Sequence, residues 1–349
     1  MKIKKRILIS PLNWGLGHAS RCIPIIHDLI KNNFEVIIAA EGRSYKLLKN
    51  EFSDIEFISI NGVEIRYSKY IPMHLSILIQ FPRILYGIYN EHQIIKEVIT
   101  QHKIDGIISD SRFGLWHKNV KSVFMTHQLE IQSAVFKKIL QKINYWFINK
   151  FTECWIIDDL KYKLSGSLAS PCLMPKRFKY IGCVSRLTYK EEVKIYDICC
   201  IISGPEKQRT YFETIILESI KKINKKTIII LGKTEEDNVH HINNTTIISS
   251  ANTKQINKYI LESKIIISRS GYSTVMDLFQ LRAKAIFIPT PGQTEQEYIA
   301  KRLKDKGICY YQDQNDFDLS EAINKSEQYS GFQLSKNINK QKKSLFSLF

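Results

Sequence analysis

Short runs of β-branched and other apolar residues alternate along the chain with segments whose apolar residues recur at helical spacing. In the first half the apolar runs that predict strands are 6–10, 34–40, 55–60, 105–110, 122–127 and 153–159. Helical patterns lie between them, for example at 19–31 and 44–51. Because helices that connect successive strands make those strands parallel, this half predicts an α/β unit with a parallel sheet covered on both faces.

The same rhythm begins again after residue 195. The second set of predicted strands is 197–204, 226–232, 245–250, 264–271, 284–290 and 308–313. Predicted helices separate them at 209–222, 254–262, 273–282 and 294–305. The sequence therefore predicts two doubly wound Rossmann-like domains, and ligands of such sheets bind beyond the carboxyl ends of the strands.

The boundaries of these domains follow from the same pattern. We expect an N-terminal domain over 1–184, a polar linker over 185–195, a C-terminal domain over 196–320, and a C-terminal helix with a basic tail over 321–349. A length of 349 residues fits about two domains. The cleft between the domains is the expected ligand site.

The composition is that of a globular protein, with 44% hydrophobic and 24% charged residues. The longest apolar stretch, 71–89, contains His74, Arg83 and two prolines, so we predict no transmembrane segment. The apolar run near the N-terminus is too short for the core of a signal peptide. We therefore expect a cytoplasmic protein.

The net charge is +17, which suggests an anionic partner such as a phosphate-bearing substrate or an acidic membrane surface. The alternative is compositional drift, because the chain is rich in Ile, Lys and Asn. The basic residues are spread along the chain without a recognised nucleic-acid module, so nucleic acid is not an expected partner. The seven cysteines form no CxxC pair and the nine histidines show no metal-ligand spacing, so we expect neither a disulfide framework nor a metal.

The first candidate site is the turn between the first strand and the first helix, from Asn13 to His18. Gly15 and Gly17 permit a tight turn and close approach of a ligand, and the helix N-terminus offers free N–H groups. His18 stands at this turn and is suited to general-base chemistry near neutral pH. The alternative is an ordinary turn with an incidental histidine.

The second candidate is a similar turn in the second half, where Arg269, Ser270 and Gly271 lead from a strand into a helix. Backbone N–H groups at such a turn can bind a diphosphate. Asp277 lies one to two helical turns further on, where a carboxylate can accept hydrogen bonds from ribose hydroxyls. The alternative is a capped helix with a surface aspartate.

Two further strand-end turns carry polar side chains. One contains Gln293, Gln296 and Glu297, whose amides and carboxylate can bind a hydroxyl-rich ligand. In the other, Ser203 and Gly204 supply turn donors and Arg209 supplies a guanidinium suited to phosphate. The alternative for the first is a Pro-Gly turn followed by a capped helix, and the alternative for the second is a linker-side loop with one exposed arginine.

These motifs together resemble the GT-B glycosyltransferases, in particular the MurG-like group with a glycosyltransferase family 28 type C-terminal domain. The glycine turn ending in His18 resembles that family's glycine loop, and His127 with Gln128 resembles its strand-end motif. Ser270, Gly271, Thr274 and Asp277 match the donor-site motif in order and spacing, and 293–298 resembles its sugar-binding segment. The family usually has glutamate at the place of Asp277 and two adjacent glutamines at 296–297, so the donor sugar stays open.

The resemblance implies an inverting glycosyltransferase that takes a sugar from a nucleotide-diphosphate donor, UDP-linked by expectation, and needs no metal or other cofactor. The C-terminal domain would bind the donor through residues of the three later motifs, namely Ser203, Gly204, Arg209, Arg269, Ser270, Gly271, Thr274, Asp277, Gln293, Gln296 and Glu297. His18 would be the catalytic base, and the acceptor side would include Asn13, Gly15, Gly17, Arg21, His127 and Gln128. The expected acceptor is a hydroxyl compound, and the MurG likeness points to a lipid-linked one.

Two other functions stay open. Residues 17–22 also resemble a motif of a MurG-like branch that hydrolyses a nucleotide sugar, with water as acceptor. A catalytically silent scaffold on the same fold is the alternative from a different class.

The segment 136–151 is basic and amphipathic. Phe136, Ile139, Leu140, Ile143 and Phe147 share one helical face, and Lys137, Lys138, Gln141 and Lys142 lie off it. This pattern fits a helix on an anionic membrane surface at the inner face of the cell membrane, and it equally fits a helix that covers the sheet. The stretch 71–89 and the C-terminal tail are further candidates for lipid contact.

Overall fold

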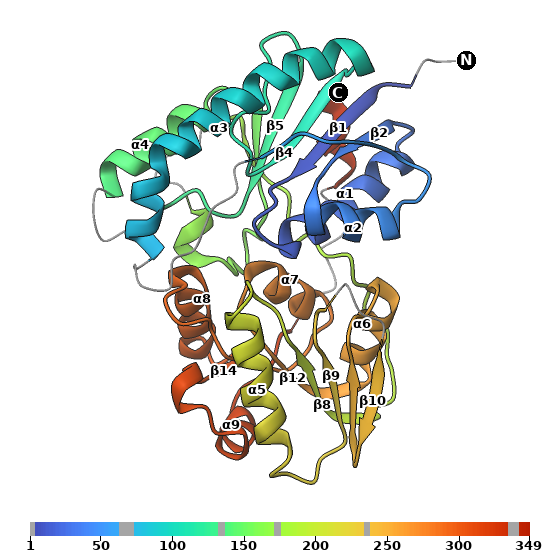
Figure 1. The fold of residues 1–349 in the computed structure, drawn as a ribbon, viewed down its shortest axis with the longest axis vertical. Coiled ribbons are helices and arrows are strands. Elements are labelled where there is room, and N and C mark those ends of the chain that lie inside the picture. Colours follow the sequence, from blue (N-terminus) through green and yellow to red (C-terminus); the bar gives the residue numbers. More distant parts are fainter. Residues whose placement is uncertain (1–3, 63–72, 132–136, 171–175, 234–237, 334–341) are drawn as a thin grey trace. The chain divides into compact units, whose positions relative to one another are not determined.

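The computed structural model describes residues 4–62, 73–131, 137–170, 176–233, 238–333 and 342–349, the side chains of 73–78 and 342–344 aside. The chain forms two compact units (Figure 1). The first comprises Met1–Val184 together with Asn337–Phe349, and the second comprises Ser185–Lys336. Each unit is a mainly parallel sheet with helices, so the α/β doubly wound fold class predicted from the sequence is confirmed.

The first unit contains a parallel seven-stranded sheet in the order β3-β2-β1-β4-β5-β6-β7. Its strands are β1 (Arg6–Pro11), β2 (Glu35–Ala39), β3 (Glu56–Ile58), β4 (Gly106–Asp110), β5 (Lys121–Thr126), β6 (Glu153–Ile156) and β7 (Phe178–Tyr180). Its helices are α1 (Leu16–Lys31), α2 (Gly42–Glu51), α3 (Met73–His102), α4 (Lys137–Ile148) and the short η1 (Gly166–Ala169). The central strands are buried apolar runs, as both faces of a covered sheet require.

The second unit contains another seven-stranded sheet, in the order β10-β11-β9-β8-β12-β13-β14. Its strands are β8 (Tyr196–Ile201), β9 (Thr227–Ile230), β10 (Val239–Ile242), β11 (Thr245–Ile248), β12 (Ser263–Ser268), β13 (Ala285–Phe287) and β14 (Tyr310–Tyr311). Its helices are α5 (Gln208–Ile220), α6 (Thr253–Leu261), α7 (Tyr272–Gln280), α8 (Thr294–Asp305), η2 (Gln314–Asp316) and α9 (Leu319–Ser326). Among the described strands of this sheet, β10 alone pairs antiparallel, with β11.

Both sheets reverse their strand order at one point. In the first unit β1 lies between β2 and β4, and in the second unit β8 lies between β9 and β12. The crossover connections leave in opposite directions from these central strands, which opens a crevice at their carboxyl ends. The turns that follow β1 and β12 are therefore at the places where doubly wound folds bind ligands.

The C-terminal segment η4 (Lys342–Leu348) packs on the first unit. Phe346 and Phe349 are buried and make edge or tilted ring contacts with Phe34 and Trp155. A Cβ added at Gly106 would lie 2.4 Å from Cδ1 of Phe349, so the absence of a side chain there makes room for the terminal ring. The expectation that the tail contacts lipid is wrong for these aromatic residues, because they are part of a protein core.

The helix α4 corrects part of the amphipathic prediction. Ile139 is 56% exposed, whereas Gln141 points inward and donates a hydrogen bond to the Leu129 carbonyl at 2.6 Å. Asn144 and Ile148 are the buried residues of the helix. The face of α4 that packs inward is therefore not the predicted apolar face, which contains Ile139. Phe136, also assigned to that face, lies outside the described residues.

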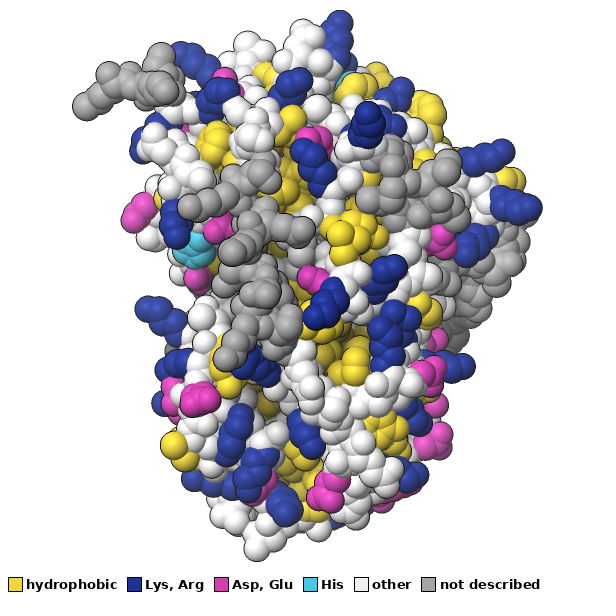
Figure 2. All heavy atoms as spheres, turned by 180° about the vertical axis from the view of Figure 1, so that it is seen from behind, with side chains coloured by type: hydrophobic (Ala, Val, Ile, Leu, Met, Phe, Trp, Pro, Cys, Tyr) yellow, Lys and Arg dark blue, Asp and Glu magenta, His cyan; other side chains and the backbone are white. Residues whose placement is uncertain are grey.

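Basic side chains are frequent on the surface, in keeping with the net charge of +17. On the face seen in Figure 2, Lys and Arg side chains are interspersed among the other side chains of the described residues. No helix among these residues has the length and apolarity needed to cross a membrane. The same residues contain no group of three or more His, Cys, Asp and Glu that could hold a metal ion.

Candidate functional site

The turn between β1 and α1 leaves the start of α1 open. Gly15 is the N-cap of the helix, makes no side-chain cap, and is followed by no acidic residue in the first turn. A Cβ added at Gly15 would meet nothing within 4 Å, and its φ of 169° is extended, so a glycine is not required by the backbone. The backbone N–H groups of the first helical turn and the open space above Gly15 make this helix end suitable for a polar ligand.

The other end of this turn is fixed by hydrogen bonds. Leu12 N donates to the Asp110 carbonyl at 3.0 Å, which joins the turn to the end of β4. The exposed Asn13 accepts a hydrogen bond from Ser44 Oγ at 3.0 Å, which joins it to α2. A Cβ added at Gly42 would lie only 3.0 Å from Asn13 Nδ2, and Gly42 has a left-handed φ of 55°, so glycine is favoured at this position.

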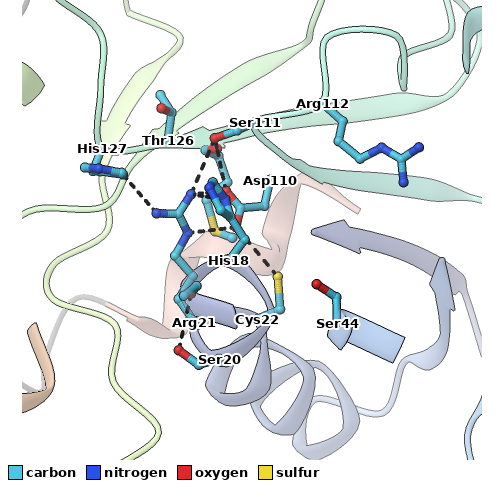
Figure 3. Close-up of polar contacts among 12 residues, drawn as sticks. His18, Ser20, Arg21, Cys22, Ser44, Asp110, Ser111, Arg112, Thr126 and His127 are labelled. Carbon is cyan, nitrogen blue, oxygen red and sulfur yellow. Dashed lines mark hydrogen bonds and ion pairs between the residues drawn. The ribbon is translucent and has the colours of Figure 1, made fainter. Parts of the chain in front are cut away.

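His18, Arg21, Asp110 and His127 form a polar group at the carboxyl ends of β1, β4 and β5, which we call the Arg21 cluster (Figure 3); all but the partly exposed His18 are buried. Arg21 Nε donates to Asp110 Oδ2 at 2.7 Å, and Arg21 Nη2 also donates to Asp110 Oδ1. The Nδ1 atom of His18 lies 2.8 Å from Arg21 Nη2 and 3.2 Å from Asp110 Oδ2. On the other side, Arg21 Nη1 lies 2.9 Å from Nδ1 of His127.

The charges in the cluster keep Asp110 ionised and His18 neutral. Burial by itself raises the pKa of Asp110, but the nearby Arg21 and His18 outweigh it and hold this pKa well below its ordinary value. Burial, reinforced by the positive charge of Arg21, lowers the pKa of His18 against the opposing effect of Asp110. A neutral imidazole whose side chain is 20% exposed is therefore present at neutral pH, as a general base or a hydrogen-bond donor requires.

The neighbours of the cluster have other roles. Cys22 Sγ lies 4.0 Å from Asp110 Oδ2, and burial together with this carboxylate raises the pKa of the thiol well above its usual value. Cys22 is therefore a neutral thiol and no nucleophile. Gln128 is the second residue after β5, and its backbone N–H donates to Thr126 Oγ1 at 3.0 Å. Gly17 is bonded through its carbonyl to Ser20 Oγ at 3.2 Å.

In the second unit, the turn after β12 holds the start of α7 open in the same way. Gly271 is the N-cap of α7 and has no side-chain cap, and a Cβ added there would meet nothing within 4 Å. Ser270 is buried and donates from Oγ to the Gln296 carbonyl at 2.8 Å, so its hydroxyl anchors α8. Thr274, one turn further, is half-buried. The backbone N–H groups of the first turn of α7 follow Gly271 directly.

Asp277 is held by the segment that begins the second unit. Its Oδ1 accepts a hydrogen bond from Ser185 Oγ, and Ser185 Oγ in turn accepts from Leu187 N at 3.0 Å. Burial raises the pKa of Asp277 to about 6, although Arg186 and the Ser185 hydrogen bond oppose this shift. Arg186 donates from Nη1 to Thr253 Oγ1 at 3.2 Å, and its buried Nε finds no hydrogen-bond partner among the described residues. Sequence analysis missed both Ser185 and Arg186.

The glutamine-containing turn is tied together by its own side chains. Gln296 Oε1 accepts from Thr290 N at 2.8 Å, and Glu297 Oε1 accepts from Gly292 N at 2.8 Å. Gln296 Nε2 also donates to Gln293 Oε1. Gly292 has a left-handed φ of 78°, with open space where a Cβ would stand. These side chains shape the turn, and their contact with a sugar stays a prediction.

Arg209 does not present a free guanidinium to a phosphate. It is buried, its Nε donates to Glu206 Oε1 at 2.6 Å, and its Nη1 donates to Glu213 Oε2 at 2.7 Å. Ser203 and Gly204 do lie at the end of β8, and Gly204 has a φ of 126° that favours glycine. Ser203 and Gly204 thus form the strand-end turn that the sequence predicts, whereas the bonds of Arg209 to two glutamates give no support to a phosphate role for its guanidinium.

Arg269 is buried among carbonyl groups. Its Nη1 donates to the carbonyls of Ile288 at 2.9 Å and Pro289 at 3.1 Å, and its guanidinium stacks 4.1 Å from the ring centre of Phe212. Burial lowers the pKa of Arg269 to about 9. Its Nε has no hydrogen-bond partner within the described part of the chain. Arg269 therefore links β12, the turn after β13 and α5, and direct contact with a donor stays a prediction.

The chain is similar in sequence to known glycosyltransferases. Residues 198–348 match the glycosyltransferase family 28 C-terminal domain. The chain is 22% identical over 364 residues to a UDP-N-acetylglucosamine--N-acetylmuramyl-(pentapeptide) pyrophosphoryl-undecaprenol N-acetylglucosamine transferase of Histophilus somni (strain 129Pt), covering 98% of this chain and 92% of that protein.

Solved glycosyltransferases have the same fold. The glycotransferase of kitacinnamycin aligns with a TM-score of 0.65 at 12% identity, over 93% of each chain. The calicheamicin glycosyltransferase CalG4 aligns with a TM-score of 0.63 at 10% identity, over 94% of this chain and 92% of that one. MurG of Acinetobacter baumannii aligns with a TM-score of 0.53 at 13% identity, over 94% and 93%. The GT-B, MurG-like resemblance drawn from the sequence motifs is confirmed by these matches.

Proposed function

For this chain, a MurG-like glycosyltransferase of GT-B fold with a family 28 C-terminal domain, we propose inverting, metal-independent transfer of a sugar from UDP to a hydroxyl acceptor. The observation that carries the proposal is the neutral, partly exposed His18, held by buried Asp110 and Arg21 at the strand-order reversal of the first sheet. This is the place where a doubly wound sheet binds ligands, and the group has the protonation state that the reaction needs.

We assign donor binding to the second unit. The start of α7 offers its backbone N–H groups and positive dipole end to the diphosphate, beside the open space above Gly271. Asp277 lies further along the same helix and accepts from the ribose hydroxyls once Ser185 releases it. Arg186, whose charge already acts on Asp277, supplies the positive charge that the buried Arg209 does not.

We assign proton transfer to His18. The acceptor oxygen attacks the anomeric carbon from the face opposite the leaving nucleotide, so the bond to the diphosphate oxygen breaks with inversion. The acceptor proton goes to the ring nitrogen of His18 that carries the lone pair, and the resulting imidazolium is stabilised by Asp110, 3.2 Å away. General-base catalysis of this kind is worth about 10²–10⁴-fold in rate.

The experiment that tests this function measures nucleotide release from UDP-sugars, each with and without a lipid-linked hydroxyl acceptor. Transfer predicts release that depends on the acceptor, together with a glycosylated product. Rapid release without acceptor would replace the transferase by a nucleotide-sugar hydrolase that uses the same groups with water. Absence of release from every UDP-sugar, in protein shown to be folded, would remove the catalytic proposal.

We also propose peripheral binding to the inner face of the cell membrane, where a lipid-linked acceptor is found. Exposed apolar side chains occur on α3 and α4, and exposed lysines accompany them on α4. The apolar ones are Ile79, Leu85, Tyr86, Tyr89, Ile139 and Trp146. Lys150 lies 4.4 Å from the ring of Trp146 and 5.8 Å from that of Trp116, which stacks on His92 of α3, so the two helices are linked here.

Such a surface fits amphipathic binding to anionic lipid. Flotation with vesicles of anionic lipid tests it, with neutral vesicles as comparison. We expect Trp146→Glu to reduce binding and Val193→Glu, at an 80% exposed residue of the second unit, to leave it unchanged. Equal binding of both variants and wild type would contradict the assignment.

A further inference from the structure

Arg21 contacts two imidazoles through the same kind of ring nitrogen. Its Nη2 lies 2.8 Å from Nδ1 of His18, and its Nη1 lies 2.9 Å from Nδ1 of His127. Figure 3 shows the guanidinium between the two rings, with Asp110 beside it. Arg21 is 2% exposed and Asp110 is fully buried, so no bulk water separates these groups.

The chemistry of a guanidinium restricts what each ring can be. Arginine carries N–H donors only and stays protonated in proteins. An N–H group directed at a ring nitrogen at this distance requires a lone pair on that nitrogen. A neutral imidazole has one protonated and one unprotonated nitrogen, so a ring whose Nδ1 accepts from Arg21 carries its proton on Nε2.

Asp110 competes for the same ring nitrogen of His18. It would accept from Nδ1 only if that nitrogen carried the proton, and its Oδ2 atom is 3.2 Å away. That oxygen already accepts from Arg21 Nε at 2.7 Å, whereas Arg21 Nη2 stands closer to the ring, at 2.8 Å. The contacts therefore favour Arg21 over Asp110 as the partner of Nδ1 in the protein without ligand.

We propose that Arg21 is a positioning residue that holds His18 in the tautomer with its proton on Nε2, so that the ligand-free enzyme presents a hydrogen-bond donor instead of a base. The base form arises when Nδ1 gains a proton from solvent, keeps it and donates a hydrogen bond to the ionised Asp110, while Nε2 releases its proton to solvent; the net charge does not change. The role of the base form rests on the proposed function of His18, whereas the effect of Arg21 on the tautomer does not.

The charged and titratable groups that act on the ring of His18 are Arg21, Asp110 and His127. The first stays positive and Asp110 stays negative across the neutral range, since its pKa is held well below the ordinary value. The preference between the two ring nitrogens is thus set by two fixed charges of opposite sign. Ligand binding that moves Arg21 away from the ring would allow His18 to adopt the base form, with its proton on Nδ1.

The test is the ¹⁵N spectrum of the ligand-free wild-type protein with labelled histidine, at pH values where His18 is neutral. Protonated and unprotonated ring nitrogens have distinct shifts, and His18→Gln identifies the signals among the nine histidines. We expect Nε2 of His18 protonated and Nδ1 unprotonated. A proton on Nδ1, or fast averaging between the two nitrogens, would overturn the proposal. Because no substrate is present, this result is independent of whether the protein transfers a sugar.

Two variants sharpen the result. Arg21→Gln removes the obligatory donor, so we expect the proton of His18 to move to Nδ1 and bond to Asp110. His127→Gln is the matched control, because it removes the other ring and leaves the contact of Arg21 with His18, so the tautomer should not change. An unchanged His18 tautomer in folded Arg21→Gln would also overturn the proposal; should that variant fail to fold, the wild-type spectrum decides.

Discussion

Replacing Asp110 by asparagine tests the electrostatics of the Arg21 cluster. Asp110 and Arg21 are a fully buried ion pair, with exposed fractions of 0% and 2%. Removing one partner of such a pair leaves the other charge buried and typically destabilises a protein by about 3–5 kcal/mol. Asparagine keeps one acceptor for the guanidinium, so we expect a loss of about 3 kcal/mol, the lower end of that range.

The assay is urea unfolding of Asp110→Asn against wild type, with the exposed Asp54→Asn as the matched control. A surface change of that kind should stay within about 0.5 kcal/mol of wild type. The melting temperature of the variant should fall by about 6–12 °C, since 1 kcal/mol corresponds to about 2–4 °C in a unit of this size. The Arg21→Met, Asp110→Asn double variant should lose less than the sum of the single losses, because no charge is then stranded.

The pH dependence follows from the sign of the shift. The pKa of Asp110 is lower in the folded protein than in the unfolded chain. Its contribution is therefore complete above the unfolded value of about 3.9 and is lost as the pH falls below it, through the lower folded value. The gap between wild type and variant should be constant from pH 8 to about pH 5 and should narrow only below about pH 4. A gap smaller than about 1 kcal/mol at pH 7 would refute the buried ion pair.

Three other predictions are independent of this one. His18→Gln should lower kcat by about 10²–10⁴-fold, and kcat/KM of the wild type should fall only at a pH below the ordinary histidine pKa of 6.5, because the pKa of His18 is lowered by burial and Arg21; turnover within threefold of wild type would end its role as base. Phe349→Ala should destabilise the first unit by about 3 kcal/mol in urea unfolding, because the terminal ring is buried against Phe34 and Trp155. Asp277→Asn should lose nucleotide binding yet gain stability relative to wild type as the pH rises from about 4 to about 6, because between the unfolded and the raised folded pKa only the unfolded chain ionises freely, and the gain should stay constant above that window; a stability difference that does not vary between these pH values would contradict this.

The sequence was sufficient to predict the sheets because their strands are buried apolar runs. All twelve predicted strands occur, and α8 spans the predicted 294–305. Two strands were missed, for different reasons. β7 is only three residues long, and every residue of β10 is exposed, so neither produces an apolar run.

Of the candidate site, only the parts formed by a single local motif could be predicted from the sequence. The turns at His18 and Gly271 are visible in sequence because glycines between a strand and a helix mark them. The role of Asp110 depends on a contact with Arg21, 89 residues away. Its one signal was a polar residue at the end of an apolar strand, which is common to many strand ends. The role of Arg209 also depends on its ion pairs, since local sequence does not reveal that its guanidinium is bonded to Glu206 and Glu213.

Nucleotide binding at the start of α7 is the central claim, and thermal unfolding with UDP, GDP, TDP, CMP and ADP measures it directly. UDP at a hundred times its Kd should add about 2.7 kcal/mol, a shift of several degrees. Gly271→Val is the sharpest control, because its side chain enters space that is open in the protein and its φ of −62° suits any residue. The account predicts a UDP shift in wild type that Gly271→Val abolishes while remaining folded. No shift with any nucleotide, or an equal UDP shift in both proteins, would contradict it.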